Sequence, residues 1–397
     1  MLGGMSDLLS AGNELLDDAI DLRRRLHRHP ELGLELPKTQ EAVLDALDGL
    51  PLTITTGTTS TSVVATLDGD RDGPTMLLRG DMDALPMPED TGLDFASEVD
   101  GAMHACGHDS HTAMLAGAAK LLSARRKDLA GRVVFMFQPG EEGFGGAKFM
   151  LDEGLLGDDP ARRPTAAFAI HQTPNMPPGF VALKGGAQLA SSDVLEITIN
   201  AQGGHASMPH LACDPVPIAC EIAMSVHSMI TRSIDVFDPA VVTIGKIRAG
   251  TTSNVIPETA YLLGTIRAVS ERTRHKVWDN LRRLADGIAA AHGATAEVTV
   301  TEGYPVTVND EGWATTSLEV AEQVIGTGKS LRMPSPIMGA EDFSYVLNEV
   351  PGAMIFLGTN PGDPHAHPNH SNRMVIDEGA MSTGIALYAA MALHHCR

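Results

Sequence analysis

The sequence is poor in several features on which whole classes of protein depend. It holds four cysteines in 397 residues, widely and irregularly spaced, so no disulfide framework is expected. No apolar run approaches the roughly 18 residues of a membrane-spanning helix, and the N-terminus lacks a basic segment followed by an apolar one. The 29 basic residues are outnumbered by 50 acidic ones, and the net charge of -21 argues against nucleic acid and anionic membranes as partners. The sequence therefore predicts a reduced, cytoplasmic, globular protein.

Common catalytic signatures are also missing. The chain has no His-Glu-x-x-His, no Cys-x-x-Cys, no phosphate-cradling glycine loop and no Gly-x-Ser-x-Gly turn, and it shows no internal repeat. Its length exceeds what a single hydrophobic core usually organises, so two domains are expected.

The most distinctive stretch present is MHACGHDSH at 103–111, which runs into an Ala- and Leu-rich segment with helical spacing. Cys106 and His108 are two residues apart, so an extended backbone presents both on one face. Thiolate and imidazole suit zinc and related metals. The alternative is a helix N-terminus capped by Asp109 and Ser110, with histidines on a wet surface. The pattern favours a metal site whose remaining ligands must come from elsewhere in the chain.

Polar residues follow several predicted strands at the point where each one ends. Asp81 and Asp83 follow an apolar run, and either could be a metal ligand, an orienter of a ligating histidine or a turn residue. Glu141 and Glu142 follow another run, and neighbouring carboxylates in an extended loop point in opposite directions. One could bind metal while the other acts as a base on bound water. His171 comes just past a further strand and is a ligand candidate. The strands are predicted at 63–67, 76–79, 132–138 and 166–170.

The pattern changes at about residue 188, where apolar and polar residues begin to alternate. Strands and helices then follow in the order βαββαβ up to about residue 302, which is the ferredoxin-like plan. We expect this block to be a separate domain inserted into the α/β domain. His205, between glycines and small residues, suggests close approach to another group, although a plain loop is equally compatible.

The two ends of the chain are predicted to be helical. Residues 13–29 have helical spacing and end at Pro30, and His27 and His29 are interpreted as a surface helix end. Residues 377–394 predict an amphipathic helix. Before it, Glu341 and Asp342 are interpreted as caps at a helix start. One of three histidines nearby is a plausible last ligand: His365, His367 or His370.

The candidate donors outnumber what one tetrahedral catalytic ion requires. Five side chains with one of them bridging, together with a shared hydroxide, could serve two ions about 3.5–4 Å apart. The donors are Cys106, His108, Glu142, His171 and one of the C-terminal histidines.

The sequence resembles the M20 metallopeptidase family, in particular its amidohydrolase branch. That branch comprises N-acyl-amino-acid amidohydrolases, hippurate hydrolases and hydrolases of auxin-amino-acid conjugates. The similarity covers nearly the whole chain, in order. It rests on LHRHPELG at 26–33, GDMDALP at 80–86, MHACGHDSHTAML at 103–115, FQPGEEG at 137–143, GGHASMPH at 203–210, SNVIPE at 253–258, GTIR at 264–267, GAEDFSY at 339–345 and HSNRMVIDE at 370–378.

The resemblance implies a fold and a domain organisation. It predicts an α/β protein with a catalytic α/β/α domain of the zinc-exopeptidase type, formed by residues 1–187 and 303–397. The inserted ferredoxin-like domain, residues 188–302, would be a lid that also forms a homodimer, possibly within a tetramer.

The resemblance also assigns roles to residues. Cys106 would bridge two metal ions, Glu141 would be the general base, and Asp83 would hold a ligand histidine. Four further ligands would complete the sites: His108, Glu142, His171 and His370. Other branches have a histidine where this chain has Asp81, and His108 is expected to replace it. The last motif has Asn372 where the family commonly has proline, so His365 and His367 stay open as alternatives to His370.

The inserted domain would contribute to substrate binding. His205 would reach the metals of the partner subunit and stabilise the oxyanion, while Asn254 and Arg267 would hold the carboxylate of the amino-acid product. A guanidinium suits a planar carboxylate through paired hydrogen bonds.

The implied function is metal-dependent hydrolysis of the amide bond of N-acylated amino acids, which releases a carboxylic acid and a free amino acid through a metal-bridged hydroxide. Two divalent ions per subunit are expected, with Zn²⁺ favoured and Mn²⁺ as the main alternative. A dipeptidase or carboxypeptidase of the same family, or a catalytically silent metal-binding protein, are the alternatives.

Overall fold

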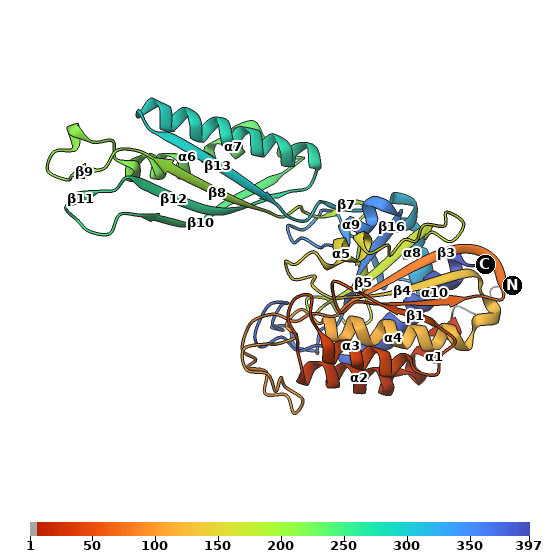
Figure 1. Ribbon diagram of the computed structural model, residues 1–397. Helices are drawn as coiled ribbons and strands as arrows, with labels where there is room; N and C mark the ends of the chain where they lie inside the picture. The colour runs from red at the N-terminus through yellow and green to blue at the C-terminus, as the bar shows by residue number, and fades with distance from the viewer. Residues whose placement is uncertain (1–5) are drawn as a thin grey trace. The chain divides into compact units, whose positions relative to one another are not determined.

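The chain is described by a computed structural model that covers residues 6–397 and divides into two compact units (Figure 1). Unit 1 comprises the described residues up to Gly186 together with Val308–Ser335 and Asp342–Arg397. Unit 2 comprises Ala187–Thr307 and Pro336–Glu341, so the predicted insertion at 188–302 falls inside it. The chain passes from one unit to the other near the short strands β7 (Gly186–Leu189) and β14 (Thr307–Asn309).

Unit 1 is built on a mixed eight-stranded sheet. Four of these strands, β3, β4, β5 and β16, run parallel to one another, and most of their residues are buried, as expected for a sheet covered on both faces. In spatial order the strands are β1 (Thr53–Thr56), β2 (Val63–Asp68), β4 (Ala130–Gln138), β3 (Arg71–Asp81), β5 (Ala166–Thr173), β16 (Gly352–Gly358), β6 (Val181–Leu183) and β15 (Ser330–Arg332).

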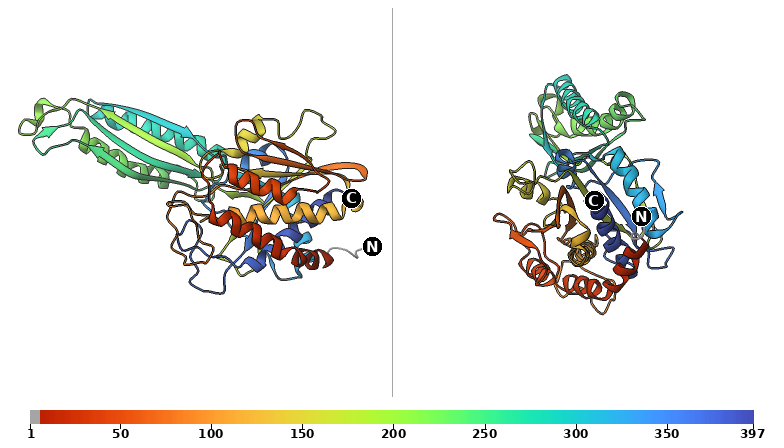
Figure 2. Two further views of the ribbon diagram at one scale, coloured as in Figure 1. Left: turned by 60° about the horizontal axis from the view of Figure 1, so that its bottom comes forward. Right: turned by 90° about the vertical axis from the view of Figure 1, so that its right-hand side faces the viewer.

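Helices α4 and α10 pack on β3 and β5, and further helices cover them; Figure 2 shows the N-terminal helices beside α4. The prediction that the last helix is amphipathic was wrong, because α1, α4 and α8 also contact α10 and bury it from Met381 to Ala392. The helices of unit 1 are α1 (Ser6–Glu14), α2 (Leu16–Arg28), α3 (Pro37–Leu47), α4 (His108–Ala124), α5 (Gly146–Asp152), α8 (Glu311–Ile325), α9 (Ser344–Glu349) and α10 (Met381–His395), with short 3-10 turns at Arg126–Asp128 and Glu378–Ala380.

Unit 2 has the element order β8-α6-β10-β12-α7-β13, with its sheet ordered β10-β12-β8-β13 and all neighbours antiparallel. Burial alternates along β8, so one face of the sheet carries α6 and α7 and encloses a separate core (Figure 1). Both helices begin at a capped residue: Asp214 accepts from the Val216 amide and Ser270 from the Thr273 amide. The bounds are β8 (Asp193–Asn200), α6 (Pro215–Ser233), β10 (Ala240–Ala249), β12 (Thr259–Ala268), α7 (Glu271–Ala291) and β13 (Thr295–Glu302).

A small ladder lies outside this sheet. Strand β9 (Gly204–His205) pairs antiparallel with β11 (Val255–Ile256), and a 3-10 turn follows at Pro209–Leu211. Over residues 6–397, no helix is both long and apolar enough to span a bilayer.

Candidate metal centre

The carboxyl ends of three parallel strands bring the predicted donors together. In the sheet, β3 lies between β4 and β5, so β4 and β5 are added on opposite sides of β3. Where the direction in which strands are added reverses, a crevice forms at the carboxyl ends of the strands, and ligands bind there in open α/β sheets. Asp81 ends β3, the loop after β4 carries the two glutamates, and His171 lies within β5 rather than just past it.

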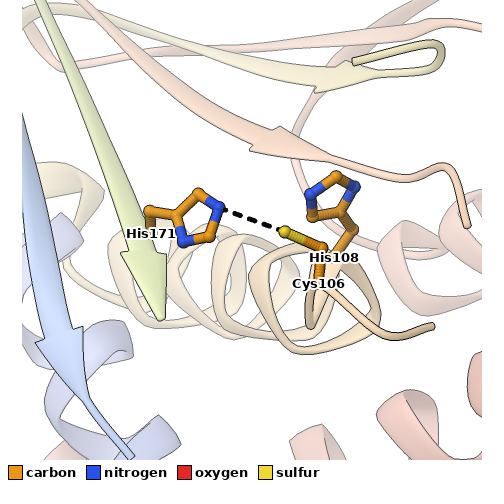
Figure 3. Close-up of side chains that lie close together, drawn as sticks. All are labelled: Cys106, His108 and His171. Carbon is orange, nitrogen blue, oxygen red and sulfur yellow. Dashed lines mark hydrogen bonds between the residues drawn. The ribbon is translucent and has the colours of Figure 1, made fainter. Parts of the chain in front are cut away.

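The first candidate group combines Cys106, His108 and His171, whose ligand atoms lie within 4.8 Å of one another. The Cys106 sulfur is 3.5 Å from Nε2 of His171, and Figure 3 shows it between the two imidazole rings. His108 is the first residue of α4. Gly107 precedes it with φ +82°, a backbone conformation that glycine adopts without strain and that turns the chain from the Cys106 loop into the helix.

Both histidines bond the backbone through Nδ1, so Nε2 is the ring atom nearest the other candidate ligands. His108 Nδ1 donates to the backbone oxygen of Asp83 at 2.9 Å, and His171 Nδ1 donates to the backbone oxygen of Gln172 at 2.7 Å. A carbonyl oxygen can only accept, so Nδ1 of each ring carries a proton and Nε2 is the ring atom that a metal ion could bind. This arrangement of outer hydrogen bonds is typical of metal-binding histidines.

The second candidate group combines Cys106, Glu142 and His370, again within 4.8 Å. His370 Nε2 is 3.3 Å from Glu142 Oε1. The backbone of His370 has φ +67°, and its amide donates to the Ala105 oxygen at 2.7 Å, which fixes it beside the Cys106 loop. Because Cys106 belongs to both groups, its sulfur lies where a bridging ligand would have to lie.

Two buried atoms of these groups make no hydrogen bond within residues 6–397: His108 Nε2 and Glu142 Oε1. Buried polar atoms are otherwise almost always paired, so each such atom calls for a partner. The two atoms are 3.9 Å apart. A divalent cation would satisfy both, and the donor set of one thiolate, three imidazoles and one carboxylate suits such a cation.

The electrostatics agree with a cation site. Burial lowers the pKa of His171 well below its usual value, and His111 adds to this, so the imidazole is a neutral donor. Burial also lowers the pKa of His108, but Asp81 and Cys106 outweigh it and hold that pKa well above its usual value. Burial raises the pKa of the Cys106 thiol to about 12 in the metal-free protein. The surroundings of His108 thus favour a positive charge, which a bound metal ion would supply in place of the proton. A bound metal ion would also deprotonate the Cys106 thiol.

Asp83 positions both His108 and the loop that carries Glu141 and Glu142. Its Oδ1 accepts from the Glu141 amide at 3.0 Å and its Oδ2 from the Glu142 amide at 2.9 Å. Its Oδ1 also lies 3.4 Å from Nδ1 of His108. Glu142 is thereby directed to the candidate ligands, while the buried Glu141 carboxylate lies within 4.8 Å of the ligand atoms of His108 and Glu142.

Asp81 is held by structural partners. Its carboxylate lies 2.8 Å from Arg79 and accepts from His111 Nδ1 at 2.6 Å, and Nε2 of His111 accepts the Gln172 amide at 2.8 Å. Burial raises the pKa of Asp81, but Arg79, His108 and His111 outweigh it and keep the group ionised. Both nitrogens of His111 are therefore engaged, and Asp81 supplies negative charge 3.4 Å from Nε2 of His108.

The interpretation of His27 as part of a surface helix end was wrong. The side chain is fully buried, and its ring contacts Asp109 at 2.7 Å and Glu89 at 3.2 Å. Asp109 also accepts from Arg23 at 3.0 Å. These side chains tie α2 to the first turn of α4. The N-cap position of α4 is occupied by Gly107, and not by Asp109 or Ser110 as in the alternative to a metal site.

The Asp342 carboxylate, predicted as a cap of the following helix, binds partners elsewhere in the chain. The N-cap residue of α9 is Phe343, whose side chain makes no capping hydrogen bond. The Asp342 carboxylate accepts from the Ala147 amide in α5, from Gln138 and from Arg79. Of the three C-terminal histidines, only His370 belongs to a candidate metal group among the residues that the structure describes.

Unit 2 places His205 and Asn254 side by side on the β9–β11 ladder. His205 Nδ1 accepts from the Ser207 amide at 3.1 Å, so the proton lies on Nε2 of this exposed ring. Asn254 accepts from the Ala206 amide through its backbone oxygen and from Thr252 through Oδ1, which leaves its Nδ2 group as a donor.

Arg267 lies elsewhere in unit 2. It is near the end of β12 that is remote from the β9–β11 ladder, since Thr259 at the near end pairs with Asn200. Arg267 lies eight positions after Thr259 along the strand, which corresponds to about 26 Å. Burial lowers the pKa of Arg267, although Asp193 opposes this.

Comparison with known proteins agrees with this site. The profile described as Peptidase family M20/M25/M40 matches residues 77–394. The chain belongs to that family. It is 38% identical over 389 residues to thermostable carboxypeptidase 1 of Saccharolobus solfataricus, covering 96% of each chain. It is 38% identical over 375 residues to the N-acetylcysteine deacetylase of Bacillus subtilis, covering 94% of this chain and 96% of the relative.

A solved structure of the family has the same fold. The Bacillus subtilis YXEP protein, described as a dinuclear metal binding peptidase, is 34% identical and superposes with a TM-score of 0.84, covering 96% of this chain and 99% of that one. The resemblance to the M20 family that the motifs carried is confirmed. The protein is a metal-dependent amidohydrolase of this family, and its centre takes two divalent ions.

Sequence reasoning missed the buried position of His27 and the side chains that contact the ligand-bearing segments, namely His111, Gln172 and Asn369. His27 and His111 belong to the motifs at 26–33 and 103–115, but their distance in sequence from the ligands did not indicate a contact with other site residues. Gln172 adjoins His171 and was overlooked because an amide is neither a ligand nor an acid.

Proposed function

We propose that this protein hydrolyses N-acylated amino acids, releasing a carboxylic acid and a free amino acid. The observation that carries the proposal is the pair of ligand groups that share Cys106, with the buried Glu141 carboxylate beside them. We assign Cys106 as the bridging ligand, His108 and His171 to one metal, and Glu142 and His370 to the other. When bound, two such ions polarise an amide carbonyl and lower the pKa of a bound water toward 7.

Glu141 is the general base of this proposal. It takes a proton from the attacking water and returns it to the departing amine nitrogen, so the net proton transfer is from water to amine. Asp83 fixes the direction of both glutamates through their amides. Of these two neighbouring glutamates, Glu142 is therefore proposed as the metal ligand and Glu141 as the group that transfers the proton.

Unit 2 is proposed as a ferredoxin-like lid that completes the site in a homodimer. His205 offers an Nε2 proton to the oxyanion that forms during attack, and Asn254 and Arg267 bind the carboxylate of the amino acid. Within one copy, Asn254 lies at the β9–β11 ladder and Arg267 near the remote end of β12, so they cannot contact the same carboxylate. This separation supports a shared site, in which one copy supplies Arg267 and the partner supplies His205 and Asn254.

Exposed apolar side chains on unit 2 support the dimer. Met224 on α6, Phe237 in the following loop and Val241 on the edge strand β10 are 72%, 93% and 42% exposed. Strand β10 pairs with β12 on one side, and its other edge forms no ladder among the described residues. An unpaired edge with apolar neighbours is a surface that a second copy can cover.

The test is a substrate panel on protein reconstituted with Zn²⁺ or Mn²⁺. N-acetyl- and N-benzoyl-amino acids should be cleaved with higher kcat/KM than dipeptides with a free amine. Preferential cleavage of dipeptides would instead support the alternative, a carboxypeptidase or dipeptidase, which the name of the Saccharolobus relative favours. Absence of turnover with two metals bound would contradict both. Thiolate ligation favours zinc, and the carboxylate ligand tolerates manganese.

A further inference from the structure

The side chain of Gln172 joins the three segments that carry the proposed ligands. It is fully buried in β5, next to His171. Its Nε2 donates to the backbone oxygen of Cys106 at 2.7 Å and to Oδ1 of Asn369 at 2.9 Å, and its Oε1 accepts from the Thr359 hydroxyl at 2.7 Å. One amide thus links β5, the Cys106 loop and the segment that ends in the ligand His370.

These contacts determine which way both amides face. The backbone oxygen of Cys106 can only accept, so the nitrogen of the Gln172 amide must face it. The same nitrogen donates to Asn369, so the oxygen of the Asn369 amide faces Gln172. The Asn369 nitrogen is left directed at the backbone oxygen of Gln172, 3.4 Å away, and at the sulfur of Cys106, 3.9 Å away.

The packing beneath the Cys106 loop shows how closely Gln172 fits. A Cβ atom at Gly107 would lie 2.5 Å from Gln172 Nε2 and 2.6 Å from its Cγ. The loop therefore rests directly on this side chain. Any change in the position of Gln172 would be transmitted to Cys106 on one side of Gly107 and to His108 on the other.

We propose that Gln172 and Asn369 are positioning residues that hold the Cys106 thiolate between the two metals, with the Asn369 amide donating to the sulfur. Outer hydrogen bonds of this kind orient ligands and typically change metal affinity 10- to 100-fold. The inference rests on the proposed role of Cys106 as bridging ligand. It requires nothing of the substrate or of unit 2.

The experiment titrates metal-free protein with Co²⁺, because a cysteine thiolate bound to Co²⁺ gives a sulfur-to-metal charge-transfer band in the near ultraviolet. The variants are Gln172→Met and Asn369→Leu, which keep the approximate side-chain volume and remove the amide. Asn360→Leu is the matched control. Asn360 is also half-buried after β16 and donates to the backbone oxygens of Pro174 and Asp363, which are not ligands.

We expect both variants to bind Co²⁺ about 10- to 100-fold more weakly than wild type. Asn369→Leu should also shift the charge-transfer band, because the sulfur loses a hydrogen-bond donor. Asn360→Leu should leave both quantities at their wild-type values. Thermal unfolding of each metal-free variant checks folding, and if Gln172→Met does not fold, the half-buried Asn369 decides alone.

Wild-type band position and affinity in Asn369→Leu would overturn the proposal while leaving Cys106 a ligand. Absence of the band in wild-type protein would remove Cys106 from the ligand set, and this inference with it. Wild-type protein that shows the band but does not hydrolyse N-acyl-amino acids would contradict the proposed reaction and not the role of these two amides.

Discussion

Replacing Asp83 by asparagine should displace Glu141 or Glu142 from the metal centre, although the volume of the side chain at position 83 hardly changes. The Asp83 carboxylate is buried and accepts the Glu141 and Glu142 amides at 3.0 and 2.9 Å. Asparagine has a single acceptor oxygen, so one of the two amides would face an NH₂ group. The backbone oxygen that accepts from His108 Nδ1 is unchanged, so His108 should keep its orientation.

The size of the effect follows from these contacts. A hydrogen bond to a charged group contributes about 1.5–3 kcal/mol, and one of the two is lost. The loop must shift to relieve the mismatch, and we expect kcat to fall about 10- to 100-fold, as for other residues that support metal ligands. If the amide of Glu141 is displaced, kcat falls at full metal content. If the amide of Glu142 is displaced, metal content falls too.

The assay is kcat and KM on an N-acetyl-amino acid beside metal content by inductively coupled plasma mass spectrometry. Asp310→Asn is the control, since Asp310 caps α8 through the Trp313 amide and asparagine is an equally good cap. Wild-type kcat and two bound ions in Asp83→Asn would refute the argument that this carboxylate positions the glutamates.

Further predictions concern four other positions. Glu141→Gln should lower kcat by about 10²–10⁴-fold with metals still bound, and near-normal kcat would remove it as the base. Cys106→Ser should reduce metal content much more than it lowers the melting temperature of the metal-free protein, and unchanged occupancy would exclude it as a ligand. Gly107→Ala should lower metal affinity and stability, because φ +82° is strained for alanine and its Cβ would meet Gln172; wild-type values of both would contradict this. Burial raises the pKa of Glu378, but two arginines of α2 outweigh it, so the folded-state pKa is depressed and the stability it contributes is present above about pH 4.5 and lost as the pH falls. Glu378→Gln should therefore lower the melting temperature at pH 7 by an amount that shrinks below pH 4.5, whereas a difference independent of pH would argue against the ion pairs.

The sequence predicted the buried strands and the donors at their ends well, because short apolar runs and the polar residues after them are local signals. The predicted strands at 76–79, 132–138 and 166–170 fall within β3, β4 and β5, and the pair Glu141 and Glu142 and the residue His171 were proposed for the site from their positions after strands. Pairing the donors with specific metals could not be predicted in this way. It depends on β3 lying between β4 and β5, which no local pattern specifies.

The errors have physical causes of the same kind. His27 has the helical spacing of a surface residue, and only the distant Asp109 and Glu89 make a buried position possible for it. The last helix was expected to be amphipathic, but neighbouring helices bury all of its sides. The amide contacts of Gln172 span up to 202 residues of sequence, so they have no local signature.

The central claim is that a single thiolate bridges two metal ions, and X-ray absorption at the metal edge tests it most directly on protein loaded with Zn²⁺. We predict two zinc ions per chain, each with one sulfur neighbour at about 2.3 Å, and loss of that sulfur shell in Cys106→Ser. One zinc ion per chain, or two ions with no sulfur neighbour, would contradict the account.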